Sequence, residues 1–272
     1  MRRLRLASIA AAVIATALVS AGTASASSRF VPPEFGHCVK YPKGQSGSGY
    51  SDSMCTGAVA SGARYHWLPG PGPKPGFTAS TGSVALTQWA GITTGKRATP
   101  VLTCSASRTT GEFTGADTES LELTLTGCAM GSAACQSTEA SAGEVQFAPL
   151  EGLLVTRKQE YWGLALIRWS PVLGSALASF ECGGTSVLIE GPILRVIKRD
   201  KTLSSEAELL QTGKEGSQEP SCYEPVPCSN ELGWQVPLAS IGGAPAMFAG
   251  LSAVGTQNDE EAIEADTRQE EG

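Results

Sequence analysis

The sequence has only two histidines, His37 and His66, and both lie in its first quarter. A Ser-His-Asp apparatus needs a histidine as its base, and the Gly-x-Ser-x-Gly turn that presents the serine in many hydrolases is absent. The zinc-protease motif His-Glu-x-x-His and the glycine-rich phosphate-binding motifs are absent as well. These absences argue against serine catalysis, zinc proteolysis and nucleotide use. We expect surface or packing roles for both histidines.

Basic residues are scarce too: 20 Lys and Arg face 26 Asp and Glu, which gives a net charge of −6. Without the three arginines among the first five residues the chain carries −9. This charge argues against a nucleic-acid partner, because contacts to phosphates need a surplus of Lys and Arg. Residues 258–272 hold −6 of the total, and we expect them to form a solvated acidic tail.

The N-terminus has the composition of an export signal. Basic residues come first, an apolar run follows at 9–19, and small residues at 24–26 suit cleavage before Ser27. The apolar run is short for a membrane span, which needs about 20 residues. We therefore predict that residues 1–26 are a signal peptide, that the mature protein is secreted, and that nothing holds it in the membrane after cleavage.

Eight cysteines follow the predicted signal: Cys38, Cys55, Cys104, Cys128, Cys135, Cys182, Cys222 and Cys228. An even number in an exported protein favours disulfides, whereas zinc sites usually show a Cys-x-x-Cys pair, which is absent. The sequence cannot fix the connectivity. Short loops favour three local pairs and leave a fourth, long-range pair: Cys38–Cys55, Cys128–Cys135, Cys222–Cys228 and Cys104–Cys182. We expect no metal and no cofactor.

Alternating apolar and polar residues predict strands beyond residue 80. The clearest run is 120–126, where leucines alternate with polar residues and Gly127 follows; 99–105 and 144–147 look similar. Residues 185–190 and 193–197 are also predicted strands, and 161–169, which is apolar on both faces, suits a central strand. The run 161–169 also suits a short buried helix. Gly191 and Pro192 suggest a bulge or a strand that changes sheets. Residues 204–212, with a capping serine, could form one or two helical turns.

These patterns predict a mainly β protein, an antiparallel β-sandwich or barrel-like domain, at residues 81–257. Residues 27–80 are rich in glycine and proline and form a loop-rich segment stapled by cysteines. Its aromatic residues Tyr65, Trp67 and Phe77 flank a Pro/Gly run. They either pin the segment to the body, which is the commoner role, or form an exposed binding strip.

Paired carboxylates are the one catalytic route that the sequence leaves open, because the spacing of two acids in space is invisible in a sequence. The candidates on predicted strands are Glu122, Glu144, Glu181 and Glu190. A hydrolase would need two such groups in a cleft near aromatic platforms, for which Trp162, Trp169 and Trp234 are candidates.

Several short motifs together resemble a family of exported proteins from high-GC actinobacteria. The motifs lie at residues 33–38, 50–55, 70–77, 126–128 with Cys135, 149–152, 180–184 and 256–262. The resemblance spans about residues 33–264 and supplies no activity, ligand or catalytic residue. It implies that the tail is ordered as far as about Glu264. Cys222 and Cys228 are additions to the pattern of the family that the chain resembles, which supports pairing them with each other.

Our first functional hypothesis is a secreted, non-catalytic extracellular or cell-surface protein that binds a cell-envelope component or another protein. The export signal and the missing catalytic motifs favour it. The alternative is a carboxylate-dependent hydrolase acting on extracellular polysaccharide. The sequence therefore argues against an enzyme without excluding one.

Overall fold

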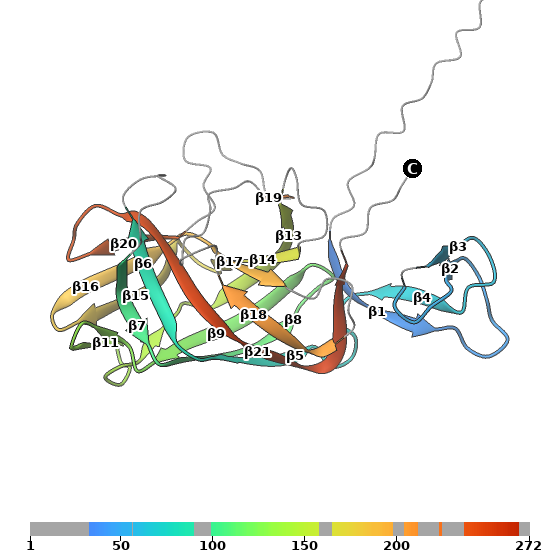
Figure 1. The fold of residues 1–272 in the computed structure, drawn as a ribbon, viewed down its shortest axis with the longest axis horizontal. Coiled ribbons are helices and arrows are strands. Elements are labelled where there is room, and N and C mark those ends of the chain that lie inside the picture. The colour runs from blue at the N-terminus through green and yellow to red at the C-terminus, as the bar shows by residue number, and fades with distance from the viewer. Residues whose placement is uncertain are drawn as a thin grey trace, which may run out of the picture.

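A computed structural model describes residues 33–55, 57–89, 99–157, 165–197, 204–211, 223–224 and 237–266. Every regular element in these ranges is a β-strand, and all pairings between strands are antiparallel (Figure 1). Within the same ranges, no helix is long and apolar enough to cross a membrane. The prediction of a mainly β, barrel-like protein is confirmed.

Eight strands close a barrel in the middle of the molecule. Each strand pairs with the next, and the last pairs with the first, so the ring has no free edge. In ring order the strands are β21 (Met247–Asp266), β5 (Gly76–Thr81), β8 (Ala106–Phe113), β9 (Thr118–Thr126), β13 (Leu150–Arg157), β14 (Ala165–Pro171), β17 (Ile193–Ile197) and β18 (Ser204–Gln211).

The remaining body strands form a second closed ring of pairings at the left end of Figure 1. The first half of β21 belongs to it, together with β6 (Val84–Trp89), β7 (Thr99–Cys104), β10 (Ala129–Met130), β11 (Ala133–Ser137), β15 (Ala176–Cys182), β16 (Thr185–Glu190) and β20 (Leu238–Ile241). Two short strands extend the sheets: β12 (Val145–Gln146) pairs with β9, and β19 (Tyr223–Glu224) pairs with β13.

Four strands form a smaller sheet beside the barrel, which we call the N-terminal module (residues 33–75). They are β1 (Glu34–Lys40), β4 (Tyr65–Pro69), β2 (Gly49–Tyr50) and β3 (Ala58–Val59), in that order across the sheet. The end of β21 pairs with the start of β1, so one long strand links both rings and the module.

The alternation seen in the sequence explains the core. In β9 the side chains of Leu121, Leu123 and Leu125 point inward and are buried, while Glu122 and Thr126 are exposed. Among the described residues, the larger of two clusters of buried apolar side chains runs through both rings. Gly191 and Pro192 separate β16 of the second ring from β17 of the barrel, so the predicted change of sheets is confirmed.

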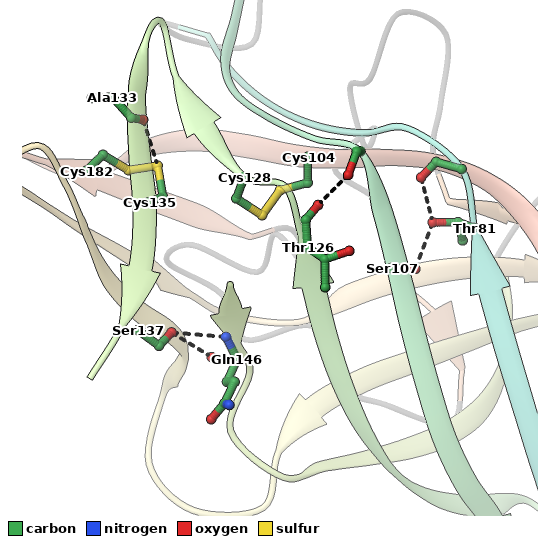
Figure 2. The surroundings of a disulfide bond; sticks show 12 residues. Thr81, Cys104, Ser107, Thr126, Cys128, Ala133, Cys135, Ser137, Gln146 and Cys182 are labelled. Carbon is green, nitrogen blue, oxygen red and sulfur yellow. Dashed lines mark hydrogen bonds between the residues drawn. A yellow bond between two sulfur atoms is a disulfide. The ribbon is translucent and has the colours of Figure 1, made fainter. Parts of the chain in front are cut away.

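Three disulfides lie within the described residues, and Figure 2 shows the two in the body. Cys38–Cys55 staples the module as predicted. The predicted pairs Cys128–Cys135 and Cys104–Cys182 are wrong: the structure joins Cys104 to Cys128 and Cys135 to Cys182, and we call these the body disulfides. Cys222 and Cys228 lie outside the described residues.

The physical reason for the correction is strand pairing. Cys135 is opposite Cys182 of β15, with Cα atoms 4.0 Å apart, and is bonded to it, whereas Cys128, which lies on the other side of β11, is bonded to Cys104 of β7, the strand beside β10. Loop length, which guided the prediction from sequence, does not reveal that β7 lies beside β10 and β15 beside β11.

Three further expectations change. Residues 204–211 form strand β18, not helical turns, because they pair on both sides with β17 and β21. The acidic tail is not a free end from residue 258: β21 continues to Asp266, with Ile263 and Ala265 buried and Glu260 exposed, which agrees with the order to about Glu264 that the resemblance implies. Strand β5 belongs to the barrel, so the loop-rich segment ends before Gly76 instead of at residue 80.

Candidate functional site

The N-terminal module carries an open, shallow hollow of about 500 Å³. Strands β2, β3 and β4 supply its lining, and the module projects beside the barrel in Figure 1. The lining combines aromatic residues with small ones: Ser48, Gly49, Tyr50, Ala58, Val59, Ala60, His66 and Trp67. Small residues keep the hollow open, and aromatic residues offer flat apolar faces with polar tips, as small-molecule sites usually do.

The hollow is held in shape by contacts around His66. The ring of Tyr41 lies against the imidazole of His66, with ring centroids 4.5 Å apart. The hydroxyl of Tyr41 donates a hydrogen bond to the carbonyl oxygen of Ser48, 3.0 Å away. Tyr41 therefore connects two residues of the lining. The Nδ1 atom of His66 is buried and has no hydrogen-bond partner.

Gly36 and the disulfide of the module position Trp67 and the loop between β2 and β3. A Cβ atom on Gly36 would come within 2.5 Å of the Trp67 ring, so glycine here lets the indole lie across β1. Cys38 is opposite Trp67 in the sheet, and its disulfide to Cys55 ties β1 to the loop between β2 and β3. Asp52 fixes the same loop, because its carboxylate accepts hydrogen bonds from the backbone N–H groups of Met54 and Gly57.

A cluster of polar and charged side chains lies inside the barrel. We call it the barrel cluster, and its members are Glu119, Trp169, Arg195, Gln257 and Asp259. Trp169 Nε1 donates a 2.6 Å hydrogen bond to Glu119 Oε1. The two side chains meet across Gly152, which lies between them in the sheet. A Cβ atom on Gly152 would come within 2.5 Å of Glu119 Cγ, so the contact requires glycine.

The charges in the barrel cluster perturb one another. Arg195 Nη1 lies 4.0 Å from Glu119 Oε1, and the Arg195 guanidinium lies over the Trp169 ring. Burial raises the pKa of Glu119, although Arg195 and the Trp169 hydrogen bond oppose the shift. Burial also raises the pKa of Asp259 to about 6, against the hydrogen bond from Gln257 and the charge of Arg195. Burial lowers the pKa of Arg195.

The barrel cluster is enclosed. Glu119 is 0% exposed, Arg195 is 2% exposed and Asp259 is 9% exposed. A polysaccharide chain cannot contact carboxylates that the barrel wall covers, so Glu119 and Asp259 do not form the open cleft that a glycoside hydrolase uses. We expect the buried charges to affect the free energy of unfolding and its dependence on pH.

The carboxylates proposed from sequence are not brought together. Glu122 and Glu181 are exposed on the outside of β9 and β15. Glu144 accepts a hydrogen bond from Gln146, and Glu190 accepts one from Ser175. Of the three aromatic platforms, Trp169 is buried in the barrel, and Trp162 and Trp234 lie outside the described residues.

Glu119 is not among the carboxylates predicted from the sequence, although its position in β9 marks it as a buried group. It falls at the inward position of β9, in step with Leu121, Leu123 and Leu125, where a carboxylate needs a partner. Arg195 is likewise a buried charged residue within an apolar run, that of strand β17. A charged residue in register with a buried apolar face is the pattern that identifies such groups.

The N-terminal aromatic residues and histidines divide between body and module. Phe77 is buried in the barrel, as the pinning role predicts, while Tyr65 and Trp67 are half-buried in the module. His37 Nδ1 bonds to the carbonyl oxygen of Ala262 and so links β1 to β21, a packing role. His66 lines the hollow.

No protein-family model, no curated protein and no solved structure matches the chain. The resemblance to exported actinobacterial proteins therefore stays a prediction. Among the described residues, no group of three or more His, Cys, Asp or Glu could hold a metal ion. The three disulfides are compatible with an oxidising environment.

Proposed function

We propose that the protein is secreted and works outside the cell as a non-catalytic binding protein, taking up a cell-envelope component or another protein through the hollow of the N-terminal module. The observation that carries the proposal is the hollow itself. It is open, it is lined by aromatic and small residues, and a disulfide and backbone-anchored loops hold it in shape.

The arrangement of the module supports a recognition role. A rigid body of closed rings projects a small sheet on which Tyr50, His66 and Trp67 lie close together. Binding residues are often carried in this way, on loops and short strands that a stable scaffold positions. The export signal predicted from the sequence and the disulfides of the structure both fit a protein that acts outside the cytoplasm.

The test uses one substitution that fills the hollow. Ala60 is exposed and lines the hollow, so Ala60→Trp covers it without disturbing a buried contact. The matched control is Ala246→Trp, an exposed alanine before β21 in the second ring. Wild-type protein and both variants are incubated with isolated cell-envelope material and with a panel of insoluble glycans, and sedimented protein and released sugar are measured together.

We expect wild type and Ala246→Trp to sediment with at least one material, Ala60→Trp to stay in solution, and no sugar to be released. Sedimentation that Ala60→Trp does not reduce would overturn the hollow as the binding site. Release of reducing sugar would overturn the non-catalytic role and favour the hydrolase.

A further inference from the structure

The charge of the protein is divided unevenly between the module and the body. Residues 33–75 contain four basic residues, Lys40, Lys43, Arg64 and Lys74, against two acidic ones, Glu34 and Asp52. Residues 76–272 contain 12 basic and 24 acidic residues. The module sequence thus carries a net charge of +2 in a protein whose total charge is −6.

Three of the four basic residues lie at the hollow end of the module. Lys40 ends β1 and is opposite Tyr65, next to the lining residue His66. The N–H of Tyr41, which follows Lys40, bonds to the carbonyl oxygen of Arg64 over 2.9 Å, so the two basic residues lie on adjacent chain segments. Lys43 follows in the next turn, and all three side chains are exposed.

Of the two acidic residues of the module, one lies away from the hollow and the other lies in the loop between β2 and β3, where backbone N–H groups bind its carboxylate. Glu34 lies at the opposite end of β1, where it is paired with Asp266 of β21. Asp52 directs its carboxylate at the backbone N–H groups of Met54 and Gly57, at 2.9 and 2.6 Å. At this end of the module the three exposed basic side chains of Lys40, Lys43 and Arg64 therefore outnumber the single carboxylate of Asp52.

From this combination we infer that the hollow binds an acidic polysaccharide, a chain of sugar rings that carry carboxylates. The inference rests on the proposed function and names its ligand class. The apolar C–H face of a sugar ring packs on aromatic side chains such as Tyr50 and Trp67, and sugar carboxylates pair with Lys and Arg by charge-assisted hydrogen bonds. An open hollow accepts one or two rings of a chain that continues in both directions.

The experiment measures affinity for soluble polygalacturonate, for neutral dextran and for poly-glutamate, at low and at physiological salt. The test variant is the double charge reversal Lys43→Glu with Arg64→Glu, both on exposed side chains. The matched control is Lys74→Glu, an exposed lysine of the same module that precedes the barrel strand β5. Ala60→Trp is measured in parallel.

We expect polygalacturonate to bind, to weaken as salt rises, and to lose about tenfold in affinity in the double variant but little in Lys74→Glu. Poly-glutamate should bind far more weakly, because it lacks rings for the aromatic residues. Dextran binding that Ala60→Trp abolishes and charge reversal leaves intact would overturn the inference and leave the proposed function standing. Poly-glutamate binding as tightly as polygalacturonate would assign the hollow to acidic peptides instead. Binding of polygalacturonate that Ala60→Trp does not change would overturn the proposed function as well.

Discussion

Replacing Asp259 by asparagine should make the protein more stable at neutral pH and should do so increasingly as the pH rises. Asp259 is buried in the barrel, where burial raises its pKa to about 6 from its ordinary value of 3.8. Between these two values the folded protein holds a proton that the unfolded chain has released. The stability that the protonated group contributes is complete below about pH 4 and is lost as the pH rises through about 6.

The magnitude follows from the shift. Each pKa unit corresponds to about 1.4 kcal/mol, so a shift of about two units gives about 3 kcal/mol over this pH window. The asparagine side chain keeps an oxygen that can accept the hydrogen bond from Gln257 Nε2, which now joins Asp259 Oδ1 at 2.6 Å. Because only the change with pH is compared, a constant difference between the two proteins does not affect the result.

The assay is urea unfolding followed by tryptophan fluorescence, at several pH values from 4 to 7, with disulfides intact. The free energy of unfolding of Asp259→Asn minus that of wild type should rise by about 2.4 kcal/mol across the range, because neither titration is complete between pH 4 and pH 7. Glu122→Gln, which removes one negative charge from the exposed face of β9, is the matched control. A difference that stays flat, or falls with pH, would refute the reasoning.

Other predictions concern the barrel and the disulfides. Gly152→Ala should lower the free energy of unfolding by about 1–3 kcal/mol, since its Cβ would press on Glu119, whereas Gly82→Ala, which has open space around it, should change it little in the same urea assay. Trp169→Phe should lower it by about 1–3 kcal/mol, because a buried carboxylate loses its indole donor; an unchanged urea midpoint would contradict this. Peptide mapping without reduction should recover the two body disulfides as separate linked peptides, and a peptide joining Cys104 to Cys182 would contradict the strand pairing.

The sequence predicts those features that depend on neighbouring residues. Alternation along 120–126 identifies β9 and its buried face, and Gly191 with Pro192 marks the change of sheets, because both are local consequences of backbone geometry. The short Cys38–Cys55 loop is local as well.

What the sequence analysis missed depends on contacts between distant segments. The partner of Cys135 lies on β15, 47 residues away in the sequence, and the strand identity of β18 is decided by β17 and β21 on its two sides. The hollow arises in the same way, since its residues come from three strands that are brought together only when β4 pairs with β2 and β2 with β3. No periodicity along the chain reports such neighbours.

The most direct test of the hollow as the binding site is an NMR titration with short oligogalacturonates, following the indole N–H signals of Trp67 and Trp169. Trp67 lines the hollow, whereas Trp169 is buried in the barrel and bonded to Glu119. Our account predicts that the Trp67 signal shifts progressively with added oligosaccharide while the Trp169 signal stays in place. A shift of Trp169 with Trp67 unchanged would contradict it and would place the ligand in the barrel.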